Sequence, residues 1–364
     1  MTDTHTQAAS WEELRSLPKV VLHDHLDGGL RPATMIELAD QVGHELPAAT
    51  AQELGDWFVQ AADSGSLVRY LETFEHTLAV MQTAEGLNRV AYEMVLDMAA
   101  DGVIYAESRW APEQHLSIGL TLQQAVDAVQ AGIDRGVAEV TAGGGQIRVN
   151  QILSAMRHLD NWDQIADLAL ANRETGVVGL DIAGPEAGFA PDRFPGVWEK
   201  LALANFPVTI HAGEADGLES INQAIHIGRA RRLGHGARLA DDITEVDAEH
   251  VAFGRVAHWI MDNQIPLELC PCSNLQTGIS ATIAAHPITA LKDMGFAVTI
   301  NTDNRLMSGT SMTNEMYRLR TEAGWTLDDF LEATLTAAWA TFMHQDERDL
   351  LGHRILAAYE PIID

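Results

Sequence analysis

The stretch that decides the fold is VVLHDHLDG, residues 20–28, in which an apolar, β-branched run leads into alternating histidines and aspartates. Side chains two residues apart on a β-strand point to the same face, so His23 and His25 would present both imidazoles where they can bind one metal ion. A His-x-His pair is weak evidence by itself, because a chain with 15 histidines contains such pairs by chance. Its meaning depends on whether other strand ends carry matching residues.

Three later motifs have the same form, with polar residues directly after an apolar run. They are His211-Ala212-Gly213-Glu214, Gly234-His235-Gly236 and Asn301-Thr302-Asp303-Asn304. A third histidine and a carboxylate, with one coordination position left open, are typical of a catalytic zinc ion. The four motifs together therefore predict a metal site.

Strand-like runs alternate with segments of helical period along the chain, which is the pattern of βα units and a parallel sheet. The eight expected strands are residues 20–25, 103–108, 147–153, 177–183, 208–211, 231–235, 265–270 and 297–301. Eight such units predict an α/β fold of the (β/α)8 TIM-barrel type. The four motifs then fall at the carboxyl ends of strands, where these barrels carry their active sites.

The chain is longer than a typical barrel, and most of the excess lies between the first two expected strands, in residues 31–101. This insertion is predicted to be mainly helical, with a break at Asp63-Ser64-Gly65-Ser66. Its large apolar residues have roughly helical spacing, and they are Trp57, Phe58, Leu67, Tyr70, Leu71 and Phe74. Two roles stay open for them, ordinary core contacts or a lid that excludes water from the barrel mouth.

The ends and composition of the chain indicate one globular domain over residues 1–364, with residues 1–10 as a flexible arm. Hydrophobic residues make up 46% of the chain, yet no run approaches a membrane span, and no signal-peptide core is present. The two cysteines, Cys270 and Cys272, are expected on one strand, poorly placed for a disulfide and without the spacing of a zinc ribbon. We expect a cytoplasmic protein with reduced thiols.

The formal net charge of −29 bears on the partners of the protein. Nucleic-acid binding needs Lys and Arg to neutralise phosphates, so nucleic acid is not an expected partner, and neither is a membrane. A neutral or weakly charged small molecule is favoured as the substrate. The oligomeric state, including a homo-oligomer, stays open.

Taken together, the motifs resemble the adenosine deaminase family of the zinc-dependent amidohydrolase superfamily, in its bacterial form. The matching stretches are Leu22-His23-Asp24-His25-Leu26-Asp27-Gly28, Asp181-Ile182-Ala183-Gly184-Pro185-Glu186, His211-Ala212-Gly213-Glu214, Arg232-Leu233-Gly234-His235-Gly236, Cys270-Pro271 to Thr277-Gly278, and Asn301-Thr302-Asp303. The resemblance covers essentially the whole chain. It implies hydrolytic deamination of adenosine and 2′-deoxyadenosine to inosine and deoxyinosine plus ammonia, in purine salvage, with one Zn²⁺ per subunit.

The resemblance also implies which residues hold the metal. Zinc would be bound by His23, His25, His211 and Asp303, with a site left for the hydrolytic water. These nitrogen and carboxylate ligands suit zinc better than a metal that prefers thiolates.

Two further residues would then carry the reaction. His235 would accept or orient the proton of the water, a task that suits an imidazole. Glu214 would donate a proton to purine N1, provided that burial raises the pKa of its carboxyl and keeps it protonated.

Substrate contacts follow from the same resemblance. Gly184 would bring a backbone N–H close to purine N3, since glycine permits a close approach of the chain. Asp27, with His25 nearby, would accept a hydrogen bond from the ribose 5′-hydroxyl. A carboxylate at that place would repel a 5′-phosphate, so adenosine is favoured over AMP.

One position departs from the family pattern. Asn304 stands where the well-known animal enzymes carry a second Asp, the partner of purine N7; Asn offers a donor and an acceptor but no charge. An alternative is therefore deamination of another 6-aminopurine compound, such as adenine, an N6-modified purine or aminodeoxyfutalosine. A metal-containing binding or signalling protein without turnover is a third interpretation. Other histidines, such as His115, are expected at the surface or in helix packing.

Overall fold

Eight parallel strands form where the sequence predicts them, and only their ends differ from the prediction. The computed structural model describes residues 10–245, 247 and 250–363. Its parallel strands are β1 (Lys19–His25), β2 (Val103–Trp110), β3 (Arg148–Met156), β4 (Val177–Ala183), β5 (Thr209–Ala212), β6 (Arg232–His235), β9 (Leu267–Leu269) and β10 (Val298–Ile300).

Backbone hydrogen bonds join these strands into a ring. They form two four-stranded sheets, in the orders β1-β2-β3-β4 and β10-β9-β6-β5. Between β4 and β5, the Leu180 N–H donates to the Pro207 carbonyl (3.2 Å). At the other junction, the Asp303 N–H donates to His23 O (2.9 Å) and the His25 N–H donates to Asp303 O (2.8 Å). The predicted (β/α)8 barrel is thus confirmed, and Asp303 sits on the junction that closes it.

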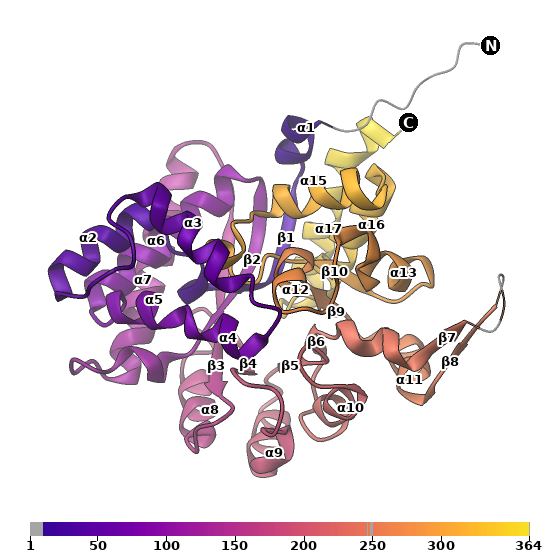
Figure 1. Cartoon of the computed structure of the whole chain (residues 1–364), viewed down its shortest axis with the longest axis horizontal. Coiled ribbons are helices and arrows are strands. Elements are labelled where there is room, and N and C mark those ends of the chain that lie inside the picture. Colours follow the sequence, from indigo (N-terminus) through magenta and orange to yellow (C-terminus); the bar gives the residue numbers. More distant parts are fainter. Residues whose placement is uncertain (1–9, 246, 248–249, 364) are drawn as a thin grey trace.

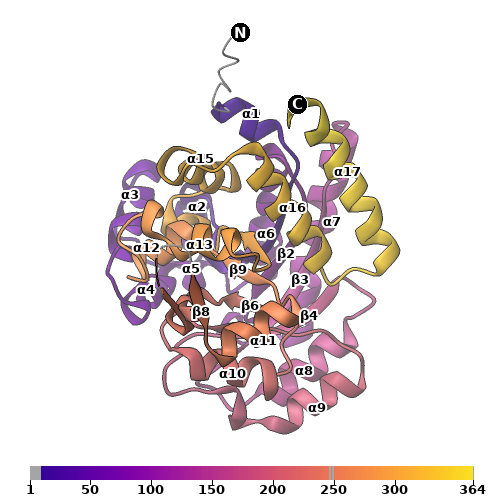
Figure 2. The ribbon, with the colours of Figure 1, turned by 90° about the vertical axis from the view of Figure 1, so that its right-hand side faces the viewer.

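Helices surround the ring (Figures 1 and 2). Those that follow β2 to β10 are α7 (Leu122–Ala142), α8 (Trp162–Ala171), α9 (Pro195–Leu203), α10 (Leu218–His226), α11 (Arg255–Asn263), α13 (Pro287–Asp293), α15 (Met312–Ala323), α16 (Leu327–Ala340) and α17 (Gln345–Ile363). Local signals set their starts: α7 begins at a capping box in which Thr121 and Gln124 satisfy each other's backbone N–H groups. No described helix is long and apolar enough to cross a membrane.

The insertion between β1 and β2 consists of helices that lie together on one side of the barrel (Figure 1). They are α2 (Pro32–Val42), α3 (Ala51–Ala62), α4 (Leu67–Glu72), α5 (Phe74–Val80) and α6 (Ala84–Ala100). The polar break at residues 63–66 separates α3 from α4. Ahead of β1, α1 (Trp11–Ser16) starts at the cap residue Ser10, and the expected arm otherwise lies outside the described residues.

Several short elements do not follow from the periodicity. An antiparallel hairpin of β7 (Ile243–Glu245) and β8 (Val251–Phe253) lies at the edge of the molecule (Figure 1). The short helices α12 (Pro271–Gln276) and α14 (Arg305–Ser308) begin directly after the ends of β9 and β10. Cys272 therefore lies in a helix, and the expectation of both cysteines on one strand was wrong because Pro271 starts α12; both thiols are buried and free.

Candidate active site

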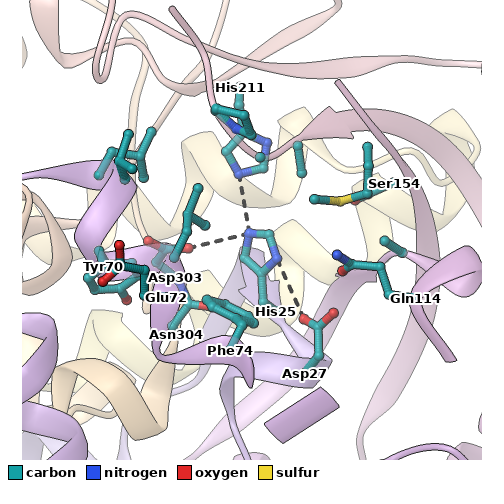
Figure 3. A pocket seen from close by; sticks show the side chains of 18 of the residues that line it. His25, Asp27, Tyr70, Glu72, Phe74, Gln114, Ser154, His211, Asp303 and Asn304 are labelled. Carbon is teal, nitrogen blue, oxygen red and sulfur yellow. Dashed lines mark hydrogen bonds and ion pairs between the residues drawn. The ribbon is translucent and has the colours of Figure 1, made fainter. Parts of the chain in front are cut away.

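A cavity of about 560 Å³ opens at the carboxyl ends of the strands. The predicted site residues that line it are His25, Asp27, Gly184, His211, Glu214, His235, Asp303 and Asn304. Figure 3 shows His25 between His211, Asp303 and Asp27, with Asn304 beside Asp303. The structure thus gathers these residues in one place, and His23 lies beneath them, fully buried.

His23, from the end of β1, has one satisfied and one free ring nitrogen. Its Nδ1 lies 3.0 Å from Glu268 Oε2, whereas its buried Nε2 has no hydrogen-bond partner. Burial alone would raise the pKa of Glu268, but the charges of Arg109 and Arg232 hold that pKa well below its usual value. An ionised Glu268 accepts the Nδ1 proton, so the Nε2 lone pair is left for another group.

The other predicted ligands converge on the same point. His25 Nε2 lies 3.2 Å from His211 Nε2, and Asp303 Oδ1 lies 3.4 Å from the Nε2 atoms of both His23 and His25. The His211 Nδ1 is held by Asp181 Oδ2 at 2.9 Å. Two ring nitrogens this close either share a proton or can bind one cation, and with Asp303 Oδ1 beside them the donor set fits a divalent metal ion.

The backbone is strained at two of the predicted site residues. His235 and Asp303 have φ of +61° and +55°, in the left-handed region that non-glycine residues rarely adopt. Such conformations cost about 1–3 kcal/mol each and persist where surrounding structure fixes them. For Asp303 that structure is the pair of hydrogen bonds to β1 that closes the barrel. The sequence carries no signal of this strain.

Glu214 is buried and lines the cavity beside the cluster formed by His23, His25, His211 and Asp303. Its Oε2 is 3.5 Å from His235 Nε2, and its buried Oε1 has no hydrogen-bond partner. Burial, followed by the negative charges of Asp303 and Glu186, raises the pKa of Glu214 well above its usual value. The protonated form, which can donate, is therefore favoured at neutral pH.

Glu186 lies in one of the matching motifs, but its role could not be predicted from the sequence. Its carboxylate accepts hydrogen bonds from the backbone N–H groups of residues 213, 214, 215 and 216, at 2.6–3.1 Å, and from Ser220 Oγ at 2.5 Å. These bonds fix the loop that carries Glu214. A short Ala-Gly link ahead of Glu214 is the only sign of such a loop in the sequence.

Asp181, Glu268 and Arg109 were also not assigned a role. All three are fully buried, and Arg109 donates at 2.6 Å to Glu268 Oε2, the carboxylate oxygen that contacts His23. A lone carboxylate inside an apolar strand run, such as Glu268, is the signal that could have identified them, because a buried charge needs a partner.

The other residues that were predicted to contact the substrate, Gly184, Asn304 and Asp27, line the cavity. Gly184 follows β4 with φ +95°, and Asn304 packs so tightly on Gly28 that a Cβ there would overlap its side-chain oxygen. Asp27 is buried between His25 Nδ1 (3.9 Å) and His115 Nε2 (3.8 Å). His115 is fully buried, so it is not at the surface; its Nδ1 contacts the carbonyl of Met81, the C-cap residue of α5, at 3.1 Å, in keeping with the expected place in helix packing.

The insertion contributes one wall of the cavity. Leu67, Tyr70, Leu71 and Phe74, from α4 and α5, line it, whereas Trp57 and Phe58 do not. The Tyr70 hydroxyl lies 3.4 Å from Ser308 Oγ. Four of the six apolar residues thus line the cavity and two do not, and the role of this wall as a lid stays a prediction.

The fold and the site define a barrel enzyme with a centre for a divalent metal. A family model described as adenosine deaminase matches residues 18–358. Adenosine deaminase 1 of Streptomyces coelicolor is 52% identical over 94% of this chain and 87% of its own, and the adenosine deaminase of Mycobacterium marinum is 51% identical over 96% and 95%. The chain belongs to the adenosine deaminase family and is a hydrolase.

Solved structures agree with this fold. An amidohydrolase of Burkholderia ambifaria with bound Zn superposes with a TM-score of 0.85, over 99% of this chain and 95% of that one. At 22% identity this likeness concerns the fold alone.

Proposed function

We propose that the protein is a zinc-dependent hydrolase that converts adenosine and 2′-deoxyadenosine to inosine and deoxyinosine, with release of ammonia. The observation that carries the proposal is the buried carboxyl of Glu214, which has a free oxygen beside the histidine and aspartate cluster. The names of the curated relatives, at about half identity over nearly the whole chain, support this substrate.

One Zn²⁺ per chain would be held by His23, His25, His211 and Asp303. The free Nε2 of His23 and the carboxylate partners on the Nδ1 atoms of His23 and His211 support this assignment, because such partners orient metal-binding imidazoles. When bound, zinc supplies a Lewis acid that brings the pKa of a water molecule to about 7.

The residues of the chain then divide the proton transfers of hydrolysis between them. Glu214 donates a proton to purine N1 as the attack of water makes C6 tetrahedral. His235, whose Nε2 faces Glu214 at 3.5 Å, contacts the attacking water. Of the two protons of the water, one restores the Glu214 carboxyl and the other leaves with the amino group as ammonia, so adenosine and water give inosine and ammonia.

Three further residues would position the substrate. The Gly184 N–H would meet purine N3, and the Asn304 amide would donate to N7. Asp27 would accept a hydrogen bond from the 5′-hydroxyl; its Oδ1 is buried without a hydrogen-bond partner, which supports this role. A 5′-phosphate would bring like charges together at this place, so nucleosides are preferred over nucleotides.

The test is ammonia release by the zinc-loaded protein from adenosine, 2′-deoxyadenosine, AMP, adenine and aminodeoxyfutalosine in parallel. Fast turnover of the two nucleosides is expected. Turnover of another compound alone would overturn the substrate assignment while keeping the metal chemistry. Absence of turnover with all five would overturn the enzymatic proposal.

A further inference from the structure

Three of the four histidines around Glu214 and Asp303, namely His23, His211 and His235, differ in what faces their Nδ1 atoms. The Nδ1 atoms of His23 and His211 lie 3.0 and 2.9 Å from the carboxylates of Glu268 and Asp181. An ionised carboxylate only accepts, so both imidazoles carry a proton on Nδ1. Their Nε2 lone pairs are therefore free for a metal ion.

His235 has an amide in the corresponding place. Its Nδ1 lies 3.1 Å from Asn274 Nδ2, and Asn274 Oδ1 lies 3.1 Å from His286 Nε2. The orientation of an amide and the tautomer of an imidazole have to be assigned from the hydrogen bonds around them. The hydrogen bond between Ile288 and His286 decides both the orientation of the Asn274 amide and the tautomer of His235.

The backbone N–H of Ile288 donates to His286 Nδ1 at 3.1 Å. A backbone N–H can only donate, so His286 Nδ1 accepts and the proton of this imidazole is on Nε2. Burial lowers the pKa of His286 to about 3, so the ring is neutral at neutral pH. The His286 Nε2–H then donates to Asn274 Oδ1, which turns the Asn274 NH₂ group toward His235 Nδ1.

These hydrogen bonds restrict the tautomer of His235, the last residue of the series. The exposed fractions of Asn274, His286 and His235 are 0%, 2% and 1%, so solvent does not compete for these bonds. His235 Nδ1 accepts, and the neutral ring must carry its proton on Nε2. That nitrogen faces the cavity, 3.5 Å from Glu214 Oε2 and close to the Asp303 carboxylate.

We propose that the hydrogen-bonded series from Ile288 through His286 and Asn274 holds neutral His235 as the Nε2–H tautomer. His235 then is not a metal ligand, and it donates a hydrogen bond to the oxygen that attacks the purine; the protons which that oxygen loses pass to the Glu214 carboxyl and to the leaving amino group. The identity of that oxygen rests on the proposed function; the tautomer does not. Asn274 and His286 act through His235 and are positioning residues.

The direct test is long-range ¹⁵N–¹H NMR on histidine-labelled, zinc-loaded protein, which reports which ring nitrogen carries the proton. We expect His235 as Nε2–H, and His23 and His211 as Nδ1–H with metal-bound Nε2. A His235 signal with the proton on Nδ1 would overturn the proposal. This measurement needs neither substrate nor a variant.

Asn274→Asp is the variant that should move the ring proton of His235 from Nε2 to Nδ1. A carboxylate accepts from His286 and from His235, so His235 should change to the Nδ1–H tautomer, with zinc content retained and kcat for adenosine lowered by about 10²-fold. The matched control is Asn172→Asp, since Asn172 is 5% exposed and donates to Leu168 O and Gln123 Oε1 outside the cavity. The kcat of Asn172→Asp should stay within about 2-fold of the wild-type value, because substitutions away from the catalytic site usually have small effects.

Two results with Asn274→Asp would contradict the proposal: an unchanged His235 tautomer, or a kcat equal to that of the control. Should this variant not fold, the spectrum of the wild-type protein decides alone. A wild-type protein that releases no ammonia from adenosine would instead overturn the proposed substrate. The tautomer result would stand, so the two failures are distinguishable.

Discussion

The floor and one wall of the cavity are built on different principles. The floor consists of buried polar side chains from strand ends, and several of them are held by a specific partner: Glu268 holds His23, Asp181 holds His211, and Ser273 Oγ donates to Asp303 Oδ2 at 2.5 Å. The wall from α4 and α5 is mainly apolar and partly exposed, and Val68, at its rim, is 62% exposed.

This difference indicates how each part tolerates change. A floor residue acts through a polar group in a fixed position. Its replacement therefore leaves a buried polar group unsatisfied or removes a reacting group. A wall residue contributes area and volume, which another apolar side chain can supply in part. Replacements in the floor should therefore cost orders of magnitude, and replacements in the wall only a few-fold.

The largest effect is expected for Glu214→Gln. Removal of the proton donor should lower kcat by about 10²–10⁴-fold, because that is the range that general acid catalysis contributes. Zinc content should not change, since the ligands remain. Steady-state ammonia release and metal analysis on the same sample measure both, with Glu219→Gln, on the exposed start of α10, as the control. Near-normal kcat would contradict the role of Glu214.

Asp303→Asn should weaken metal binding and activity together. The change removes the charged ligand and the acceptor for Ser273, so zinc affinity should fall by more than about 10²-fold, beyond what loss of an outer partner costs. Competition with a chromophoric chelator gives the affinity. The exposed Asp293 supplies the control Asp293→Asn. Full zinc retention with full activity would exclude Asp303 as a ligand.

Asp181→Asn tests the carboxylate that contacts the proposed metal ligand His211. Asp181 fixes the Nδ1 proton of His211, and the loss of such a partner typically costs about 10–100-fold in metal affinity or activity. Burial alone would raise the pKa of Asp181, but His211 and Arg109 keep that pKa below its usual value, so the wild-type partner is charged. The same chelator competition measures the change. Unaltered affinity would show that the floor does not depend on this contact.

The smallest effect is expected for Leu71→Ala in the wall. Loss of part of one apolar contact should raise KM for adenosine by about 3–10-fold with little change in kcat. Leu203→Ala, at a side chain that is 78% exposed on α9, is the control. A fall in kcat as large as that of Glu214→Gln would break the distinction between wall and floor.

The sequence was sufficient for the floor because strand periodicity and barrel geometry bring the ends of distant strands together. His23, His211 and Asp303 could be assigned to one site once eight strands were recognised. The positive φ of His235 and Asp303 could not be predicted, since neither residue type requires it.

The partners below and behind the floor could not be assigned from sequence either. Asn274 and His286 become relevant only when α12 and the start of α13 bring them to His235 Nδ1, which depends on tertiary packing. In the wall, helical spacing predicted α4 and α5 but could not separate Leu71, which lines the cavity, from Phe58, which is fully buried away from it.

The dependence of turnover on metal is the measurement that tests the proposed metal site most directly. Zinc per chain and ammonia release from adenosine should be measured on the same protein as isolated, after removal of metal by a chelator, and after zinc is restored. We expect one zinc per chain, loss of turnover when the metal is removed, and recovery of turnover when zinc is restored. Full turnover by metal-free protein would contradict the central claim that the floor of the cavity is a metal-dependent deaminase site.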